Sequence, residues 1–567
     1  MKFGKWLRAV KFTPAWLPVL LVLLAFGLRL FQNTVTPPSP YWEEVALGYD
    51  AYSILQTGRD HHGNVLPIVA FPSFGDYKPS LYFYTLVPSI AAFGLNVWAV
   101  RLPAVIFSAL TVGVAFLLFQ KWTNTRIATW AAFLLAIQPW SWQVGRVGFE
   151  VNLAVFLLIS GVYTLNQASE YFQNVKKQKT FLAWSLLAAT CLALSMYSYH
   201  GARLLAPLFG VATLLITFDW KSNWKKPVRL LNWLPAIILG FVLLAPLLMS
   251  LLSPSVQQRF NETSIFSDPQ PVLLSNQYRE LADQAWWSRI VYHRYVFWGQ
   301  ALATNYLKHF SLSFLFLQGD ANPRHTSQYF GALYPWEALT LLVGVAVAAQ
   351  SFRHKKAFWL LVVLTLLSPI AASVTTATPH ALRALPLAVW LSLWSGIGMA
   401  ELIHEAHAFL LKKKLLVKVT RSFAPLLNGA IIVFCLISMG ILWVYYHYQY
   451  RVETANQWQY GYEPLISTLQ NQALPGEQIF LSREQGRPAM YLFFFGKIDP
   501  SKVQQAESGG AKDQQEFLEF ENWHFVDGQN TQPGLHAASP GLTPEKATVI
   551  QAIPDLQGKV IWNVYRQ

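Results

Sequence analysis

The sequence is poor in charge and nearly free of cysteine. Only 13% of its 567 residues are charged, whereas 53% are hydrophobic and 15% are aromatic. This composition is too apolar for an ordinary soluble enzyme and indicates a polytopic membrane protein. The two cysteines, Cys191 and Cys435, both lie in apolar stretches. They therefore predict neither a disulfide framework nor a zinc site, and the redox compartment stays undetermined.

Other common signatures are missing as well. The sequence has no internal repeat and no nucleotide-binding glycine pattern, so a soluble nucleotide is not expected as the energy source. The first apolar run, Trp16 to Leu30, has no small-residue cleavage pattern behind it, which favours a retained signal anchor. The net charge of +14 comes as short basic clusters between apolar spans. That distribution is typical of cytoplasmic loops and not of nucleic-acid binding.

Eleven apolar segments are predicted to cross a membrane as helices of roughly 20 residues. They lie near residues 14–32, 97–120, 127–145, 150–171, 180–198, 202–218, 231–252, 336–352, 357–376, 380–401 and 424–447. A further segment, Leu81 to Gly94, is apolar over only about 14 residues, or about 21 Å as a helix. This is short of a hydrocarbon core of about 30 Å.

Basic clusters decide how this short segment lies. If it does not cross, all the clusters fall on the side of the N-terminus, as the positive-inside rule requires. The clusters are Lys121/Arg126, Lys176/Lys177/Lys179, Lys221/Lys225/Lys226/Arg229, Arg353/Lys355/Lys356 and Lys412/Lys413/Lys414/Lys418/Arg421. We therefore expect the segment to lie along the outer surface or to dip in and return. The protein is then a multi-pass protein of the cell membrane with a cytoplasmic N-terminus.

The chain is predicted to form two domains. Residues 1–450 would form the transmembrane domain with external loops 33–96 and 253–335, and residues 451–567 a small external soluble α/β domain. Within the tail, GEQIFLS, ENWHFVD, ATVIQAI and KVIWNVY predict strands. RPAMYLFFFG predicts a helix or a buried strand, and ESGGAKDQQEF a polar loop.

Charged residues at the outer corners of the helix bundle are the remaining chemical signal. In YWEEVALGYD, Glu43 and Glu44 begin a predicted helix lying on the membrane, although acids at a helix start are also favoured by the macrodipole alone. In GDYKPSLYFY, Lys78 follows Tyr77, and a snorkelling interfacial lysine is the simpler interpretation.

Further corners carry mostly cations. They are Arg146 with Glu150 in GRVGFEVN, Tyr199, His200 and Arg203 in YSYHGARLLAPL, Asp320, Asn322, Arg324 and His325 in GDANPRHTSQYFG, and His380 and Arg383 in TPHALRALPL. An arginine and a glutamate four residues apart also stabilise a turn, and a lone arginine often anchors to headgroups. Arg383 is predicted to lie inside a span, where an arginine needs a partner or an anionic ligand.

Together, cations beside carboxylates at one membrane face predict a lipid-linked phosphate substrate. In transfer of a sugar from a polyprenyl phosphate to a hydroxyl, a carboxylate accepts the proton of the acceptor. Cations stabilise the charge that develops on the departing phosphate. Because a phosphate needs no general acid, one basic carboxylate suffices for single displacement, by analogy with inverting glycoside chemistry.

Five stretches follow one another over about the first 400 residues. They are YWEEVALGYDAYSILQTGRDHHGNVLP, FGDYKPSLYFYTLVPSIAAFGLNVWAVRLPAVIFSALTV, GRVGFEVNLAVF, YSYHGARLLAPL and TPHALRALP. In combination and in order they resemble the GT-C membrane glycosyltransferases, specifically the superfamily of protein O-mannosyltransferases and aminoarabinose transferases. The resemblance implies the GT-C fold with about eleven transmembrane helices.

The resemblance also implies roles for particular residues. The family carries an Asp-Glu pair, with the aspartate implicated in catalysis, then a Lys-Pro pair, then a second acid in the next external loop. The matching positions here are Glu43, Glu44, Lys78 and Glu150. The resemblance further implies a polyprenyl-phosphate sugar donor, with Arg203 and Arg383 holding its phosphate.

Glutamate stands where the family usually has the aspartate. The extra methylene of Glu43 moves its carboxylate by about one bond length, and a misplacement near 1 Å can slow catalysis ~100-fold. Either the pocket accommodates this glutamate or this member is impaired.

The prediction is therefore a hexosyl- or pentosyltransferase that moves a sugar from a polyprenyl-phosphate donor to an acceptor hydroxyl, with inversion. The predicted catalytic residues are Glu43, Glu44 and Glu150. The predicted substrate-binding residues are Lys78, Tyr77, Arg146, Tyr199, His200, Arg203, Arg324, His325, His380 and Arg383. The alternatives are a lipid or glycan transporter or flippase, and a catalytically inactive scaffold.

The expected partners are membrane lipids, the lipid-linked donor and a protein, lipid or glycan acceptor. No cofactor is firmly predicted. The external acids could hold a divalent cation, although they lack a close Asp-x-Asp spacing, and the cationic corners make a metal unnecessary.

Overall fold

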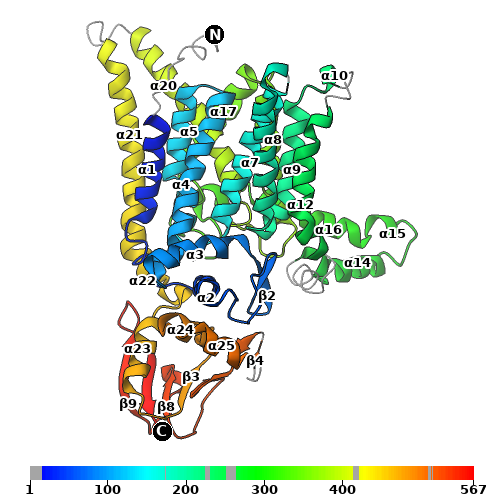
Figure 1. Cartoon of the computed structure of the whole chain (residues 1–567). Coiled ribbons are helices and arrows are strands. Elements are labelled where there is room, and N and C mark those ends of the chain that lie inside the picture. The colour runs from blue at the N-terminus through cyan, green and yellow to red at the C-terminus, as the bar shows by residue number, and fades with distance from the viewer. Residues whose placement is uncertain are drawn as a thin grey trace. The chain divides into compact units, whose positions relative to one another are not determined.

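The computed structural model describes residues 16–172, 174–223, 230–250, 264–412, 420–507, 512–513 and 515–567. Contacts divide the chain into two compact units, neither of which is continuous in sequence. The first, which we call the bundle unit, comprises Met1–Arg29, Val105–Gly145 and Glu150–Trp443. The second, the loop–tail unit, comprises Leu30–Ala104, Arg146–Phe149 and Val444–Gln567. Each is described separately below, and Figure 1 labels the elements of both.

Each predicted transmembrane segment contains a helix. Among the described residues, eight spans are long and apolar enough to cross a membrane. Their helices are α4 (Val97–Trp122), α7 (Val151–Tyr171), α8 (Gln178–Met196), α9 (His200–Thr217), α12 (Leu234–Ser250), α18 (Lys356–Leu367) with α19 (Ile370–Ser373), α20 (Leu385–Lys412) and α21 (Thr420–Val444). The other three predicted spans contain the shorter apolar helices α1 (Trp16–Leu30), α5 (Thr125–Ile137) and α17 (Glu337–Ser351). The polytopic helical class is confirmed.

Small residues allow two of these helices to pack backbone against backbone. A Cβ atom added to Gly344 of α17 would lie 1.9 Å from the Trp394 carbonyl oxygen, and one on Gly398 of α20 would lie 1.8 Å from that of Thr340. Glycine at helix contacts is what membrane bundles use to bring backbones close, because hydrocarbon tails give no hydrophobic drive between helices. The close packing of α17 against α20 therefore requires glycine at these two positions.

Helix α20 begins later than predicted. Its first residue is Leu385, so Arg383 lies in the preceding turn, and the prediction that this arginine lies inside the span is wrong. Pro386 explains the start, because proline lacks the backbone N–H that only the first turn of a helix can do without. The arginine charge therefore stands before the helix and not within it.

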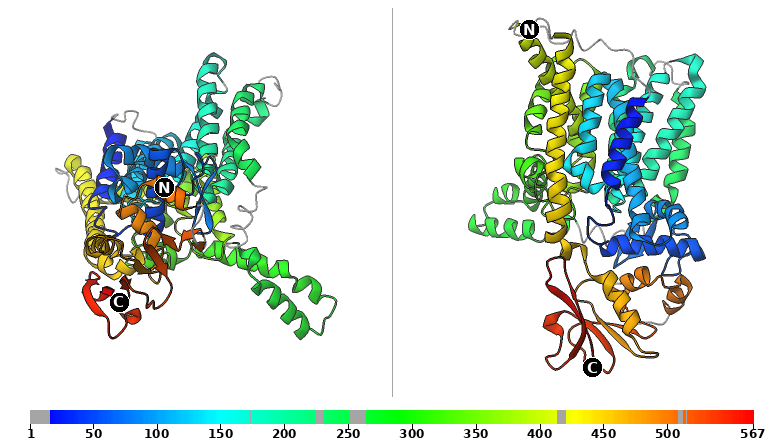
Figure 2. Two further views of the ribbon diagram at one scale, coloured as in Figure 1. Left: turned by 60° about the horizontal axis from the view of Figure 1, so that its bottom comes forward. Right: turned by 90° about the vertical axis from the view of Figure 1, so that its left-hand side faces the viewer.

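The long predicted loop 253–335 contains helices of its own. They are α14 (Gln270–Leu281), α15 (Ser288–Val291), α16 (Arg294–Lys308) and the π-helical turn η5 (Ser313–Leu317). Helices α14 to α16 form an arm that extends from the other helices of the bundle unit in both views (Figures 1 and 2). The shorter helices α6 (Pro139–Val144) and α10 (Trp220–Asn223) complete this unit.

Some predictions concern residues outside the described part of the chain. These are the basic N-terminus, Lys225, Lys226, Arg229, Lys413, Lys414, Lys418 and the loop residues 253–263. The side of the membrane on which each terminus lies stays a prediction.

Helix α2 (Trp42–Thr57) is the centre of the loop–tail unit. It is followed by the antiparallel hairpin β1 (Ala70–Ser73) and β2 (Asp76–Pro79), and by α3 (Leu81–Phe93). A Cβ atom on Gly48 of α2 would lie 2.6 Å from Val100 and 2.8 Å from Phe494, so only glycine fits this close approach. The tail also reaches the start of α2, because the Tyr491 hydroxyl donates to the Pro40 carbonyl at 3.1 Å. The helix predicted to lie on the membrane thus has much of its surface buried by protein.

Helix α3 is the short segment that the basic clusters predicted not to cross. It has 13 residues, which corresponds to about 20 Å. Tyr82, Phe83, Leu86 and Ile90 are buried. Its path relative to the membrane stays a prediction.

The C-terminal part is a β-rich domain with helices, as predicted. Its mixed six-stranded sheet has the order β6-β7-β3-β8-β10-β9, in which β3 runs parallel to β7 and β8. The strands are β3 (Ile479–Ser482), β6 (Glu519–Phe520), β7 (Trp523–Val526), β8 (Leu535–Ala538), β9 (Thr548–Pro554) and β10 (Val560–Arg566). The helices are α22 (Arg451–Glu453), α23 (Tyr462–Gln472), α24 (Pro488–Phe495) and α25 (Pro500–Ala506). All four predicted strands are present. In Figure 2 they have the orange and red colours of the last part of the chain.

The structure settles one alternative that the sequence left open in this domain and differs from the sequence interpretation at two other places. The ambiguous segment RPAMYLFFFG forms helix α24. The predicted polar loop instead carries a two-stranded pair, β4 (Lys512–Asp513) and β5 (Glu516–Phe517). Strand β8 was not predicted, because LHAA has the composition of a helix as much as of a strand.

The buried carboxyl of Glu516 makes the stability of this domain depend on pH. Its side chain is 1% exposed and lies 3.1 Å from Arg487. Burial raises the pKa from 4.5 to about 7, although Arg487 and Arg483 act to lower it. The folded protein thus binds this proton more tightly than the unfolded chain does. The contribution to stability is complete below about pH 4.5 and is lost as the pH rises through about 7.

We therefore expect the thermal unfolding midpoint of the detergent-purified protein to fall between pH 5 and pH 8. Glu516→Gln, which cannot titrate, should flatten this fall. The exposed Glu463 provides the control, because Glu463→Gln should keep the wild-type slope. An unchanged slope in Glu516→Gln would assign the pH dependence to other groups.

Candidate functional site

Glu43 and Lys78 form an ion pair in the loop–tail unit. Glu43 lies in the first turn of α2, and its Oε1 is 3.0 Å from the Lys78 Nζ on strand β2. Its Oε2 accepts a 3.1 Å hydrogen bond from the Tyr41 hydroxyl. The Glu43 side chain is 31% exposed and that of Lys78 is 12% exposed. The structure thus brings together two predicted site residues and leaves part of the carboxylate accessible.

Glu44, the next residue, has a very different environment. Both of its oxygens are bound by Arg101, whose Nε and Nη2 donate at 2.8 and 2.9 Å, and both side chains are fully buried. The backbone N–H of Gly148 also donates to Glu44 at 2.9 Å. A carboxylate held in this way cannot turn toward a substrate without breaking a buried ion pair. Its geometry suits a residue that fixes the position of α2.

Arg101 and Arg146 both hold the segment between α1 and α2. Arg101 donates to the backbone carbonyls of Pro37 at 3.1 Å and Ser39 at 2.8 Å. Arg146, predicted to bind substrate, donates to those of Phe31 and Thr36 at 2.7 and 3.0 Å. Burial lowers the pKa of Arg146 to about 10, so it stays charged at neutral pH.

Arg101 was missed by the sequence interpretation. The signal was available, since an arginine within a predicted span needs a partner, and the span 97–120 contains it. Tyr77, also predicted to bind substrate, lies beside Lys78 on β2, opposite Pro72.

Two histidines tie the loop after α2 in place. The Nδ1 of buried His61 lies 2.6 Å from an Asp50 oxygen, and His62 lies 2.9 Å from Glu507 near the end of α25. Burial acts to lower the pKa of His61, but the Asp50 carboxylate outweighs it and raises the pKa above its usual value. These contacts give GRDHHG a structural role within the loop–tail unit.

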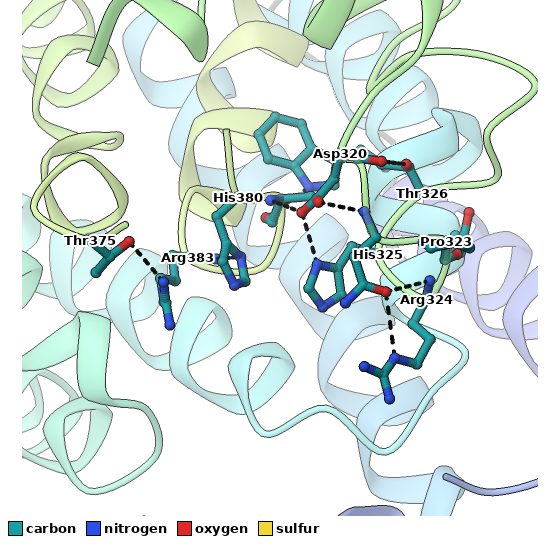
Figure 3. Close-up of polar contacts among 12 residues, drawn as sticks. Asp320, Pro323, Arg324, His325, Thr326, Thr375, His380 and Arg383 are labelled. Atoms are coloured by element: carbon teal, nitrogen blue, oxygen red, sulfur yellow. Dashed lines mark hydrogen bonds and ion pairs between the residues drawn. The ribbon is translucent and has the colours of Figure 1, made fainter. Parts of the chain in front are cut away.

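In the bundle unit, Asp320, His325 and His380 form a second group (Figure 3). The His325 Nδ1 lies 2.8 Å from Asp320 Oδ2, and the rings of His325 and His380 stack with their centres 4.8 Å apart. Asp320 Oδ2 also accepts a 2.8 Å hydrogen bond from the Ala381 N–H, and Oδ1 one of 2.9 Å from Asn322. Each ligand-type atom of these three residues lies within 4.8 Å of the others. In the described part of the chain, this is the group whose geometry could hold a metal ion.

Charge and burial set the ionisation of this cluster. Burial acts to raise the pKa of Asp320, but the hydrogen bond and charge of His325 outweigh it, and the pKa lies at about 2. Burial, together with the neighbouring His325 and Arg383, lowers the pKa of His380 well below its usual value. Asp320 is therefore ionised and His380 neutral at physiological pH.

Two predicted arginines adjoin the same cluster. Arg383 Nη1 donates to the Thr375 hydroxyl at 2.7 Å, and its backbone N–H to His380 Nδ1 at 3.4 Å. Arg324 precedes His325, and its N–H donates to Asn322 Oδ1 at 3.0 Å. Figure 3 shows the His380 ring between Arg383 and His325. Four of the predicted substrate-binding residues are thus neighbours in the bundle unit.

The remaining predicted residues of the bundle unit lie at helix starts. Glu150 precedes α7 and is 8% exposed. Tyr199 and His200 stand at the start of α9, and the Nε of Arg203 in its first turns donates to the Met196 carbonyl at 3.4 Å. The catalytic and binding roles of these residues stay predictions.

Comparison with known proteins identifies the architecture. Residues 77–249 match the family model of dolichyl-phosphate-mannose-protein mannosyltransferases. Among solved structures, the chain is similar to ArnT from Cupriavidus metallidurans bound to undecaprenyl phosphate, with a TM-score of 0.56, 13% identity, and coverage of 97% of this chain and 98% of that one. For ArnT from the same organism in the apo state, the TM-score is 0.51 at 12% identity, and 97% of each chain is covered. A search of curated proteins gave no match.

The fold is that of the GT-C membrane glycosyltransferases. The resemblance predicted from the sequence motifs is confirmed by the fold and, over residues 77–249, by the mannosyltransferase family model. The chain thus combines the GT-C fold with helices long and apolar enough to cross a membrane several times.

Proposed function

We propose that this protein transfers a sugar from a polyprenyl-phosphate donor to an acceptor hydroxyl at the external membrane face, with inversion. The observation that carries the proposal is the partly exposed Glu43 carboxylate beside Lys78, at 3.0 Å. A general base must be reachable by the proton it accepts, and Glu43 is reachable whereas Glu44 is buried. The family match and the solved ArnT with bound undecaprenyl phosphate support a lipid-linked donor.

In the proposed reaction, the acceptor hydroxyl loses its proton to the Glu43 carboxylate as its oxygen attacks the anomeric carbon. The bond between that carbon and the phosphate oxygen breaks, and the phosphate leaves with the electron pair. Lys78 can stabilise the charge that develops on the phosphate, because a preorganised cation does so without reorganising water. A single displacement of this kind inverts the configuration of the sugar.

The other predicted residues take supporting roles in this proposal. Glu44 acts as a positioning residue, since its ion pair with Arg101 fixes the turn that carries Glu43. Arg146 supports the same segment through the carbonyls of Phe31 and Thr36. Glu150 keeps the role of second acid implied by the resemblance.

For the donor phosphate, we propose binding by cations of the bundle unit. They are Arg203, Arg324, His325 and Arg383, with Tyr199, His200 and the neutral His380 as further contacts. Tyr77 stays a predicted substrate contact beside Lys78 in the loop–tail unit. Arg383 is the strongest candidate, because its guanidinium is oriented by Thr375 and it precedes the helix instead of lying inside the span.

Arg383→Ala is expected to weaken binding of undecaprenyl phosphate to the purified protein by about 10- to 100-fold. A hydrogen bond to a charged group contributes ~1.5–3 kcal/mol, and 1.4 kcal/mol corresponds to tenfold. The affinity can be measured by titrating the lipid in detergent. Arg353→Ala is the control and should leave the affinity unchanged, because Arg353 is exposed and distant from Arg383 in sequence. Unchanged affinity in Arg383→Ala would mean that the arginine serves only to hold Thr375.

The function as a whole is tested with labelled donors. The purified protein is incubated with undecaprenyl-phosphate hexoses and pentoses carrying a radiolabelled sugar, together with peptide, lipid and glycan acceptors. Transfer of label to an acceptor, or consumption of one donor, supports the proposal and names the sugar. Movement of the intact labelled lipid across vesicles without transfer would instead indicate a flippase, and neither result would indicate an inactive scaffold.

A further inference from the structure

The cluster of Asp320, His325 and His380 has the composition of a metal site. Two imidazoles and one carboxylate are typical ligands of zinc, which commonly takes three protein ligands and leaves a fourth position open in catalytic sites. No cysteine contributes, and no Asp-x-Asp spacing is present in this sequence. Asp320 and His325 come from one loop, and His380 lies more than 50 residues further along the chain, so the fold brings the third residue to the other two.

The distances suit a single small ion. With metal–ligand distances of ~2.0–2.2 Å, two ligands of a tetrahedral site lie about 3.3 Å apart. His325 Nδ1 and Asp320 Oδ2 are 2.8 Å apart, and the widest separation among the three ligand atoms is within 4.8 Å. An ion in place of the proton shared by His325 and Asp320 would move these two ligand atoms slightly apart. Rotation of the His380 side chain would bring its ring nitrogen closer to them.

The surroundings fix the Asp320 carboxylate and the backbone that carries His380. The Ala381 and Asn322 N–H groups fix the Asp320 carboxylate at 2.8 and 2.9 Å. His309, a buried histidine, accepts a 3.1 Å hydrogen bond from the His380 N–H and is itself 2.9 Å from the Asn305 carbonyl. Such contacts orient first ligands and are part of what makes a metal bind tightly. The backbone at His380 and Ala381 is therefore fixed from both sides.

We propose that Asp320, His325 and His380 bind one zinc ion. The ion is not required by the proposed function, since Lys78 and the arginines already supply cations. Its fourth position would be open to an oxygen ligand, and a phosphate oxygen matches it in charge, because zinc with one carboxylate leaves a net positive site next to Arg383. This second step rests on the proposed function and assigns the donor phosphate as that ligand.

The zinc site is tested by metal content and by a cobalt spectrum. Full-length protein is purified in detergent, stripped with EDTA, and titrated with zinc chloride and, in parallel, with magnesium chloride. We expect about one zinc per chain by elemental analysis and no comparable binding of magnesium. Cobalt(II) in the same site should give the intense visible bands of a tetrahedral ion, which report the site without any variant.

Variants then assign the ligands. Asp320→Asn, His325→Ala and His380→Ala should each weaken zinc binding more than ~10-fold, whereas exposed His354→Ala should bind as the wild type does. Wild-type protein that takes up no zinc would overturn the proposal. Equal zinc binding by all four variants would overturn it too, because the metal would then be adventitious.

The phosphate step has its own readout. Undecaprenyl phosphate, or inorganic phosphate as the soluble comparison, should shift the cobalt bands if it takes the fourth position. A shift with the lipid at lower concentration than with inorganic phosphate identifies the headgroup of the donor as the ligand. Cobalt bands that neither phosphate changes would overturn this step. If the wild-type protein shows the cobalt bands but transfers no sugar in the labelled-donor assay, the result counts against the proposed function and not against the metal site.

Discussion

Glu43→Gln is expected to lower sugar transfer by at least ~100-fold while the protein stays folded and inserted in the membrane. The amide keeps the size of the side chain and loses the ability to accept a proton, and a positioned general base contributes ~10²–10⁴ to a rate. The side chain is partly exposed, so its change should cost little stability, in contrast to its buried neighbour. Activity per folded protein, measured with the labelled donor, checks this expectation.

Two further variants serve as controls for the test of Glu43. Glu463→Gln changes an exposed acid of the tail domain and should keep wild-type transfer. Glu43→Asp restores the residue usual in the family and should keep far more activity than Glu43→Gln, because a carboxylate remains in place. Full transfer by Glu43→Gln would remove the glutamate from the role of base.

Glu44→Gln is expected to give the opposite pattern, with a large loss of stability. Glu44 and Arg101 are both fully buried and joined by two hydrogen bonds of 2.8 and 2.9 Å. Removing one charge leaves the other buried and unpaired, which typically costs about 3–5 kcal/mol. The thermal unfolding midpoint in detergent should therefore fall well below that of both wild type and Glu43→Gln.

The double variant separates this ion pair from its surroundings. If the pair is the cause, Glu44→Gln combined with Arg101→Gln should lose less than the sum of the two single changes, since no uncompensated charge remains. A Glu44→Gln midpoint equal to that of Glu463→Gln would mean that the ion pair does not hold α2. In that case the predicted catalytic role of Glu44 would gain weight.

The transmembrane part could be predicted well because hydrocarbon imposes one strong rule on every span. Each apolar segment must be a helix that satisfies its own backbone, so a long apolar run is enough to find it. Boundaries depend on local chemistry instead, and there the prediction was wrong. At Arg383, the first-turn proline Pro386 decided the helix start, although the apolar pattern alone placed the arginine inside.

The site was only partly accessible from the sequence. Glu43 and Lys78 were named because the motifs resemble a known family, and the structure joins them in an ion pair. Arg101 escaped notice although it lies in an apolar span, because its partner Glu44 is 57 residues away and pairing at that distance leaves no periodic signal. Likewise, His380 joins Asp320 and His325 only through the fold, and the spacing of the three residues matches no zinc motif.

The hydrogen bond between Tyr491 and Pro40 spans 451 positions of the chain. At ~5–20 residues per second, roughly 20 to 90 seconds of translation separate the two partners. During that time the segment that contains Pro40 and Glu43 has been synthesised, but Tyr491 has not. A chain that stopped before Tyr491 would therefore lack this contact to the backbone just before α2.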